Sequence, residues 1–486
     1  MGNQSLPKIN TMILCTAICG ASVFLTACNS DNSGKLGNSG IGSNDALKVD
    51  ALKVDENGYL RNRLGKEVVL RGVNFGGWMI QESWMCPVSG TDRQWANLDT
   101  INAMKNQGFT DAQIQELFDT YQDNWITADD FDFLKSRGVN SIRIPFWYRN
   151  FMSDESGTWI NGDNGSAVET ANPGFKRLDW AVTEAKKRGI YVILDMHGVP
   201  GGQSMDHSCG TLGKNEVYTD YTYEQITVDL WKAIAFRYKD EAAVAAYDLL
   251  NEPQNNGGYS GPNAWAPGGT RAVYETIRMY DILYRAVRSV DPFKICIMEG
   301  IWSMNLPDPK YVHKGSPDQN RRYSGKTTVW DNVMYSMHLY DSKLNDINKR
   351  VNELKKARND WKVAIHVGEF NNGDNQQTNA YDLYNNNKFS WNMWTYKIAG
   401  ANMGNWSLYQ AANKAKADPR TDSFETIKQK WGETLLTFSS ETNDINNGFS
   451  VMRGMEQYFS PAMNHTISDV ITNSNQTGFP VDPVSE

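Results

Sequence analysis

Two glutamates close short apolar runs of the chain and could carry acid–base and nucleophilic chemistry. Glu252 lies near the end of residues 247–253 (YDLLNEP), and Glu369 lies near the end of residues 362–370 (KVAIHVGEF). Apolar runs of this length are typical of buried strands, and a proline stops the first of them. We therefore expect two carboxylates at two strand ends, one serving as an acid/base and the other as a nucleophile.

An alternation of strand and helix patterns positions these glutamates. Apolar runs predict strands at 68–75, 141–146, 190–197, 243–250, 294–299, 332–340, 362–370 and 390–397. Helical periodicity predicts helices at 110–125, 127–138, 175–188, 223–238, 271–290 and 343–361, a weaker helix before residue 390 and one more at 424–436. Such alternation favours a parallel sheet, and eight units favour an α/β fold of the (β/α)₈ TIM-barrel type in one large domain.

The ends of the predicted strands carry polar and aromatic side chains, which a barrel would gather on one face. They are Asn74 with Trp78, Arg143, His197, Asn251 with Glu252, Glu299, His338 with Tyr340, Glu369, and Trp394. Taken singly, Arg143 could neutralise a buried acid, and either histidine could be a core residue. Together they predict a single polar site lined by rings.

The ordered motifs resemble glycoside hydrolase family 5. They are IRIP at 142–145, DMHG at 195–198, NEP at 251–253, HLY at 338–340, GEF at 368–370, and Trp394. The resemblance spans about residues 68–409 and implies a retaining glycosidase without a cofactor. By this resemblance Glu252 matches the acid/base and Glu369 matches the nucleophile.

Electrostatics suits those two roles. A positive charge favours the ionised form of a neighbouring acid, so we expect Arg143 to hold Glu369 ionised, with Tyr340 donating a hydrogen bond to the same carboxylate. The negative charge of Glu369 should in turn keep Glu252 protonated for longer.

The remaining predicted site residues would bind the sugar. Asn251 is suited to hydrogen-bond a 2-hydroxyl, His197 and His338 would form hydrogen-bonding walls, and Trp394 would lie beneath the apolar face of the ring. Glu299 is a rival third carboxylate, interpreted as a supporting or substrate-binding group near Trp302. If it exchanged roles with Glu252, our assignment would fail.

A metal site is a weaker alternative. Asp195, His197, His338, His366 and Glu369 are all metal-ligand types, but the sequence has no His-x-His or His-x-x-x-His spacing. We therefore expect no metal.

Two loops suggest the substrate. Residues 71–78 and 197–203 are similar to the corresponding loops of the exo-β-1,3-glucanase branch of the family, which favours exo-acting hydrolysis of a β-1,3-glucan. Residues 79–108 and 204–216 depart from that branch. An endo-acting β-1,4-glucanase or mannanase, a transglycosylase and a non-catalytic surface glycan-binding lipoprotein remain alternatives.

The N-terminal segment resembles a bacterial lipoprotein signal. A basic start and an apolar stretch end at residues 25–28 (LTAC), which predicts a signal peptide 1–28, acylation at Cys28, a polar tether 29–55 and a catalytic domain 56–486. Asn29 after the cysteine favours the outer membrane of the bacterial cell envelope. A plain signal peptide or a short anchor is the alternative.

Cysteines and charge complete the expectations. Cys86 and Cys209 follow two different predicted strands, and either a disulfide or two free thiols fits them, whereas Cys296 reads as a core residue. The net charge is −8 without a basic block, which argues against a nucleic-acid partner. We expect a monomer.

Overall fold

The computed structural model describes residues 52–89, 95–254, 270–300, 303–318, 323–373, 376–399, 406–410 and 415–433. All of them belong to one compact unit, Ser43–Glu486. The predicted signal peptide, Cys28 and nearly all of the predicted tether lie outside the described residues. Across the described ranges, no helix has both the length and the apolar character that a membrane crossing requires.

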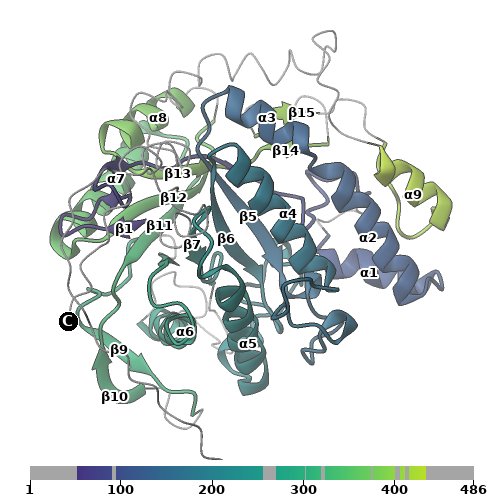
Figure 1. Cartoon of the computed structure of the whole chain (residues 1–486), viewed down its shortest axis with the longest axis horizontal. Helices are drawn as coiled ribbons and strands as arrows, with labels where there is room; N and C mark the ends of the chain where they lie inside the picture. The colour runs from purple at the N-terminus through teal and green to yellow at the C-terminus, as the bar shows by residue number, and fades with distance from the viewer. Residues whose placement is uncertain are drawn as a thin grey trace, which may run out of the picture. The chain divides into compact units, whose positions relative to one another are not determined.

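Eight parallel strands close into a barrel, which confirms the predicted fold (Figure 1). In spatial order around the barrel they are β4 (Arg71–Asn74), β5 (Ser141–Trp147), β6 (Tyr191–Gly198), β7 (Val244–Asp248), β8 (Ile295–Glu299), β11 (Val333–Leu339), β12 (Ala364–Phe370) and β13 (Ser390–Met393). Met393 of β13 pairs with Val73 of β4, and this pairing closes the barrel. Every residue of β6 is buried, as expected for a strand covered on both faces.

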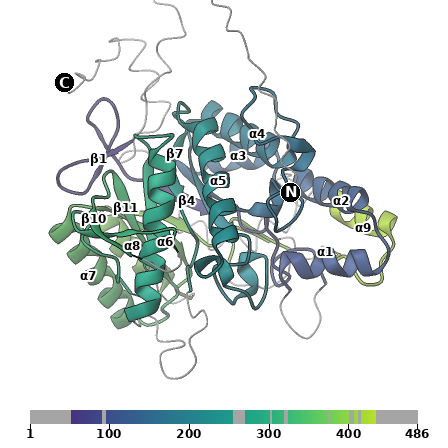
Figure 2. The same cartoon turned by 90° about the horizontal axis from the view of Figure 1, so that it is seen from below.

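Helices cover the outside of the barrel (Figures 1 and 2). The helices predicted from periodicity are α2 (Asp111–Trp125), α3 (Ala128–Ser136), α4 (Pro173–Lys187), α5 (Tyr221–Tyr238), α6 (Thr270–Arg288), α7 (Leu344–Trp361) and α8 (Gln377–Asn386). The short helical turns are η1 (Tyr148–Asn150), η2 (Ile160–Gly162), η3 (His207–Cys209) and η4 (Glu216–Tyr218).

Three helices form a layer beside α3 and α4. They are α1 (Asn97–Asn106), α2 and α9 (Phe424–Gly432). The predicted helix at 424–436 therefore exists, and it packs on α2, where Trp431 contacts the rings of Phe118 and Tyr121. The start of α2 has a capping box, because Thr110 Oγ1 accepts a hydrogen bond from the Gln113 amide at 3.2 Å and Gln113 Oε1 accepts one from the Thr110 amide at 3.0 Å.

A three-stranded sheet lies at the ends where the barrel strands begin. It consists of β1 (Lys53–Val54), β2 (Leu60–Arg61) and β3 (Glu67–Val68). The Val54 amide donates to Asn332 Oδ1 at 2.9 Å, just before β11 begins. The expected boundary between tether and domain at residue 55 falls between β1 and β2 of this sheet.

Two further pairs of strands were not predicted. β9 (Val312–Gly315) and β10 (Tyr323–Thr328) pair as antiparallel strands, and β9 packs on α6. The predicted eighth strand, 390–397, ends at Met393, and the separate strand β14 (Lys397–Ile398) then pairs with β15 (Tyr409–Gln410).

The proposed disulfide is wrong, and the free-thiol alternative is confirmed. Cys86, Cys209 and Cys296 are separate buried thiols. Cys209 Sγ lies 3.1–3.3 Å from three backbone carbonyl oxygens of its own loop. Cys86 Sγ likewise stays within its own loop, 3.3 Å from the Glu82 amide.

Candidate active site

A buried arginine lies at the centre of the site. Arg143 on β5 is 0% exposed, and its guanidinium contacts carboxylates from four other strands. The N–O distances are 3.1 Å to Asp195, 2.9 Å to Asp248, 3.0 Å to Glu299 and 2.8 Å to Glu369. Burial alone would lower the pKa of Arg143, but these acids raise it well above its ordinary value, so the side chain stays charged.

Amide oxygens complete the coordination of the guanidinium. Asn74 Oδ1 and Asn251 Oδ1 accept from Arg143 at 3.0 and 2.8 Å. Asn251 is therefore turned toward Arg143, with 1% exposure.

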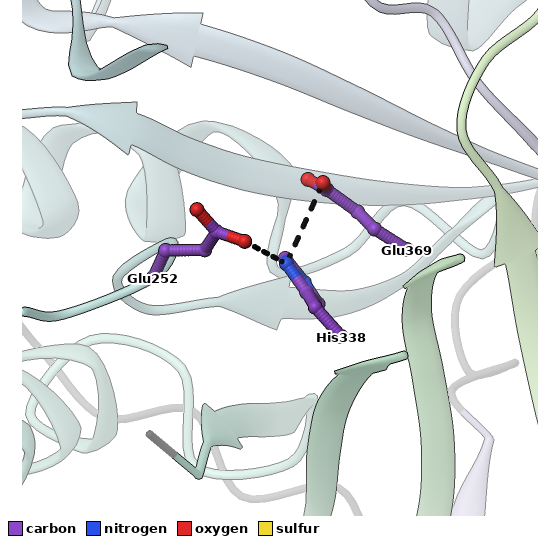
Figure 3. Close-up of side chains that lie close together, drawn as sticks. All are labelled: Glu252, His338 and Glu369. Atoms are coloured by element: carbon purple, nitrogen blue, oxygen red, sulfur yellow. Dashed lines mark hydrogen bonds and ion pairs between the residues drawn. The ribbon is translucent and has the colours of Figure 1, made fainter. Parts of the chain in front are cut away.

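The two predicted catalytic glutamates meet at a histidine (Figure 3). His338 Nδ1 lies 2.8 Å from Glu252 Oε1 and 3.5 Å from Glu369 Oε2. One carboxylate oxygen of Glu252 and one of Glu369 lie within 4.8 Å of each other. The structure thus brings together the two carboxylates that the sequence placed at separate strand ends.

Small local features allow this approach. A Cβ atom at Gly368, just before Glu369, would lie 2.8 Å from His338 Nε2, so only glycine leaves room for the imidazole. Glu252 has a positive φ of 39°, a conformation that costs energy for a side chain of this kind. Its amide donates to Glu299 Oε2 at 2.7 Å, and this bond holds the strained residue in place.

The pKa values of His338 and Glu299 are shifted in opposite directions, and both shifts favour the charged form. Burial alone would lower the pKa of His338, but Glu299, Glu369 and the hydrogen bond to Glu252 raise it well above 6.5, so the imidazole is positively charged. Burial would raise the pKa of Glu299, but His338, Arg143 and the Glu252 amide lower it to about 2.

Glu369 departs from our expectation. The ion pair with Arg143 is present, and Tyr340 donates to Glu369 Oε2 at 2.8 Å. Even so, burial raises the pKa of Glu369 above its ordinary value by more than His338 and Arg143 lower it. Both contacts that we expected to hold Glu369 ionised, from Arg143 and from Tyr340, are therefore present, but burial opposes their effect on its pKa.

A cavity of about 450 Å³ opens above the glutamates. Five of the predicted residues line it: Glu252, Glu369, His197, Tyr340 and Trp394. His197 stacks on Trp394 with ring centroids 5.5 Å apart, and its Nδ1 lies 2.7 Å from Asp195 Oδ2. The other three predicted residues, Arg143, Asn251 and His338, are not among the lining side chains.

Glu299 is 2% exposed and contacts Arg143, His338 and the Glu252 backbone. It does not line the cavity. This supports the interpretation of Glu299 as a supporting group rather than as a substitute for Glu252, while Trp302 lies outside the described residues.

The sequence analysis missed further residues that line the cavity. Glu82 and Trp84 follow β4, His207 follows β6, and Trp406 lies beyond β13. His207 Nε2 lies 3.1 Å from Glu82 Oε2, and Trp84 Nε1 donates to the same oxygen at 2.8 Å. Their position in the sequence could have pointed to them, because Glu82 and His207 fall in the two loops that depart from the exo-β-1,3-glucanase branch.

A comparison with protein families decides the identity of this site. The model of the cellulase family, glycosyl hydrolase family 5, matches residues 92–400, which is more than half of the chain. The chain belongs to glycosyl hydrolase family 5. It is therefore an O-glycosyl hydrolase, and the resemblance drawn from the motifs is confirmed.

Curated relatives carry several names within this chemistry. The chain is 27% identical over 390 residues to a β-xylosidase of Phanerodontia chrysosporium, covering 73% of this chain and 71% of that protein. It is 31% identical over 229 residues to a probable glucan 1,3-β-glucosidase A of Aspergillus fumigatus, covering 46% and 48%. It is 33% identical over 197 residues to a glucan 1,3-β-glucosidase of Blumeria graminis, covering 39% and 42%. The matches thus span less than half the length of these two glucosidases.

Solved structures share the barrel of this family 5 chain. An endogalactoceramidase superposes with a TM-score of 0.52 and 18% identity over 79% of this chain and 85% of that one. The structure of AoRut superposes with a TM-score of 0.50 and 20% identity over 76% and 97%. At these identities, the likeness concerns the fold alone.

Two groups of side chains near the site are of metal-ligand type, but their surroundings favour proton transfer over metal binding. Among the described residues, Glu252, His338 and Glu369 could surround an ion. A histidine ligand must be neutral, whereas the neighbouring glutamates raise the pKa of His338 and favour its protonated form. A second set, Asp195, Asp248 and Glu299, already surrounds the Arg143 guanidinium.

His366 is a satisfied core histidine. It is 0% exposed, with Nε2 2.9 Å from Asn392 Oδ1 and Nδ1 3.3 Å from Ser336 Oγ. Burial lowers its pKa to about 3, so the side chain is neutral.

Proposed function

We propose that this family 5 enzyme hydrolyses a β-glucan with retention of anomeric configuration, acting on β-1,3 linkages from a chain end. The spacing of its two carboxylates carries the proposal. Retaining glycosidases hold their two carboxyl groups roughly 5–5.5 Å apart, and inverting enzymes roughly 6.5–9.5 Å apart. Oxygens of Glu252 and Glu369 within 4.8 Å of each other fit the retaining arrangement.

The reaction follows from the positions of these groups. Protonated Glu252 gives its proton to the glycosidic oxygen, while ionised Glu369 attacks the anomeric carbon and forms a glycosyl ester. Glu252, now ionised, takes a proton from water, whose oxygen displaces Glu369 and restores both side chains. The positive charges of Arg143 and His338 and the Tyr340 hydroxyl stabilise the buried charge of Glu369 at each stage.

The shape of the cavity favours binding at a chain end. The pair between His207 and Glu82 joins the loop after β6 to the loop after β4 beside the cavity. A cavity of about 450 Å³ bounded in this way holds a short sugar segment. Trp394 offers a flat apolar surface that suits the face of a glucose ring. The names of the glucan 1,3-β-glucosidase relatives support the choice of linkage.

Product analysis tests the proposal. Wild-type protein is incubated with laminarin, lichenan, cellulose, mannan and an aryl β-xyloside, and the products are separated by chromatography. We expect glucose from laminarin, released first as the β anomer in a proton NMR time course. Glu252→Gln and Glu369→Gln should each lower the rate at least about a thousandfold.

Each alternative gives a different result. Oligosaccharides from lichenan, cellulose or mannan would indicate an endo-acting enzyme, and products longer than the substrate would indicate transglycosylation. Initial release of α-glucose would contradict retention. Full activity in either variant would overturn the catalytic assignment, and a wild type inactive on the whole panel would favour a glycan-binding protein.

We also propose that the enzyme is exported and held at the outer membrane by lipid on Cys28. The support is the sequence at 25–28 together with the polar stretch that follows it.

A further inference from the structure

A second hollow lies between α2 and α4, which run side by side in Figure 1. It consists of two cavities of about 530 and 750 Å³. They share lining residues from α2, from α4 and from the loop before α4, namely Gln115, Asp119, Gln122, Ile160, Asn161 and Arg177. Shared walls make the two cavities a single elongated feature, which we call the α2–α4 groove.

A buried amide in this groove has no internal partner. Gln122 is 5% exposed and lines both cavities. Within the described part of the chain, no side chain or backbone group forms a hydrogen bond with its amide. A primary amide offers two donors and one acceptor oxygen, and these remain available to a ligand in the cavity. Such a group is suited to a hydroxyl-bearing ligand.

The surrounding polar groups are fixed in place. Arg177 of α4 lies 2.8 Å from Asp119 Oδ1 and 3.1 Å from Asp123 Oδ1, both on α2. Gln115 Nε2 donates to Asp119 Oδ1 at 2.9 Å. These contacts pre-organise donors and acceptors along the groove. The groove is lined by acids and by the basic side chains of Arg149, Lys176 and Arg177, so opposite charges offset one another and a neutral ligand suits it.

An indole ring supplies an apolar surface. Trp180 on α4 lines the larger cavity and is only partly buried. Its ring is held edge-on by Trp78 at 6.0 Å and by Phe131 at 5.6 Å between centroids. A rigid aromatic surface beside amide and carboxylate groups is the combination that recognises a sugar ring, whose faces are apolar and whose rim is polar.

The groove lies close to the active-site cavity. His207 and Ser208 of η3 line the active-site cavity. Two residues further on, Gly210 packs so closely on Trp147 that a Cβ atom there would collide with the indole. Trp147 in turn lines the smaller cavity of the groove. The segment around η3 and the Trp147 side chain therefore connect the walls of the two features.

We propose that the α2–α4 groove is a second binding site for a neutral glycan chain. It would hold one segment of a polysaccharide while the active site acts on another, which raises the effective concentration of chain ends at the catalytic glutamates. The choice of a β-glucan as the chain rests on the proposed function, whereas binding of a neutral glycan does not.

Two variants test the groove without touching the catalytic groups. Trp180→Ala removes the apolar surface. Gln122→Leu removes the amide while keeping most of its volume, and it should leave the melting temperature unchanged or raise it, because a buried unpaired amide is lost. Trp361→Ala on α7 is the matched control, since this partly buried tryptophan also packs edge-on against a neighbouring ring, that of Tyr335.

Binding is measured in a Glu252→Gln background with insoluble β-1,3-glucan, cellulose, mannan and xylan. We expect each groove variant to weaken binding to at least one of these glycans about threefold to tenfold, and the Trp361→Ala control to bind normally. With Glu252 intact, kcat/KM for an aryl β-glucoside should stay the same, while hydrolysis of the insoluble polymer slows.

The outcomes separate the two proposals. Cleavage of laminarin together with unchanged binding by both groove variants would overturn the groove and leave the proposed function standing. Groove-dependent binding without cleavage would support the groove and overturn the proposed function. If the Glu252→Gln protein with an unchanged groove bound none of the four glycans, the groove proposal would be overturned.

Discussion

At the scale of single residues, the site depends on one protonated histidine among three glutamates. His338 lies 2.8 Å from Glu252, 3.2 Å from Glu299 and 3.5 Å from Glu369. Its charge opposes the effect of burial on Glu369, which must be ionised to attack. The histidine therefore acts through the glutamates, as a positioning residue whose charge lowers the pKa values of Glu299 and Glu369.

His338→Gln should move the acidic limb of the kcat/KM profile to higher pH. Loss of a positive charge raises the pKa of Glu369 further, so more base is needed to ionise the nucleophile, and we expect a shift of about one pH unit. An aryl β-glucoside assay from pH 4 to about pH 9 measures it. Tyr340→Phe, which removes a hydrogen bond but no charge, should shift the limb less. An unchanged limb in His338→Gln would mean that the histidine has no electrostatic role.

His207 gives a second prediction, concerning stability. Burial would lower its pKa, but hydrogen bonds to Asp206 and Glu82 raise it to about 9. Because this lies above the ordinary value of 6.5, the stabilisation is fully present below about pH 6.5 and is lost as the pH rises through about 9. His207→Gln should lower the melting temperature at pH 6 and have little effect at pH 10. The same deficit at both pH values would disprove the charge effect, and exposed His313→Gln is the control.

Strand-end positions predicted most of these residues, but contacts between loops did not follow from sequence. Arg143, Glu252 and Glu369 each lie at or near the end of a run with strand periodicity, and a barrel must gather such ends. Glu82 and His207 lie in loops without periodicity, and their pairing depends on how two distant loops fold together. The raised pKa of Glu369 likewise depends on burial, which no motif encodes.

At the scale of elements, α2 is the helix on which α1 and α9 pack, and it forms one wall of the α2–α4 groove. Thr110→Ala should destabilise the protein by about 1 kcal/mol, because the first turn of α2 loses its cap. Thr120→Ala is the matched control, since Thr120 Oγ1 bonds the Glu116 carbonyl within the helix and its loss is expected to be neutral or mildly stabilising. Chemical denaturation measures both. Equal losses in the two variants would show that the Thr110 cap contributes no more to stability than an ordinary hydroxyl inside the helix.

Elements with a strong hydrophobic pattern were predicted from the sequence. Elements that depend mainly on pairing with another segment were not. β6 and β12 are mostly apolar and are buried along their whole length, as expected for strands covered on both faces. The residues of β10 are mostly exposed and polar, so its pairing with β9 leaves no hydrophobic pattern to detect. The separate thiols of Cys86 and Cys209 were equally hidden, because loop geometry decides whether two sulfurs can meet.

At the scale of the whole molecule, the catalytic groups all come from the barrel and its loops, within the unit Ser43–Glu486. We therefore expect activity on small substrates to be independent of the segment that precedes this unit. That segment would instead decide where the enzyme is held, and a tethered barrel would meet polysaccharides at the cell surface.

Cys28→Ser tests whether membrane attachment and catalysis depend on separate parts of the chain. In a bacterial host, wild-type protein should sediment with the outer membrane, and its N-terminal peptide should carry the mass of attached acyl chains. Cys28→Ser should lose both properties and keep its kcat/KM on an aryl β-glucoside, because the site lies elsewhere in the chain. Cys19→Ser, within the predicted signal, should stay lipidated and membrane-bound. If Cys28→Ser remained in the membrane fraction, hydrophobic contacts other than the acyl chains would hold the enzyme there.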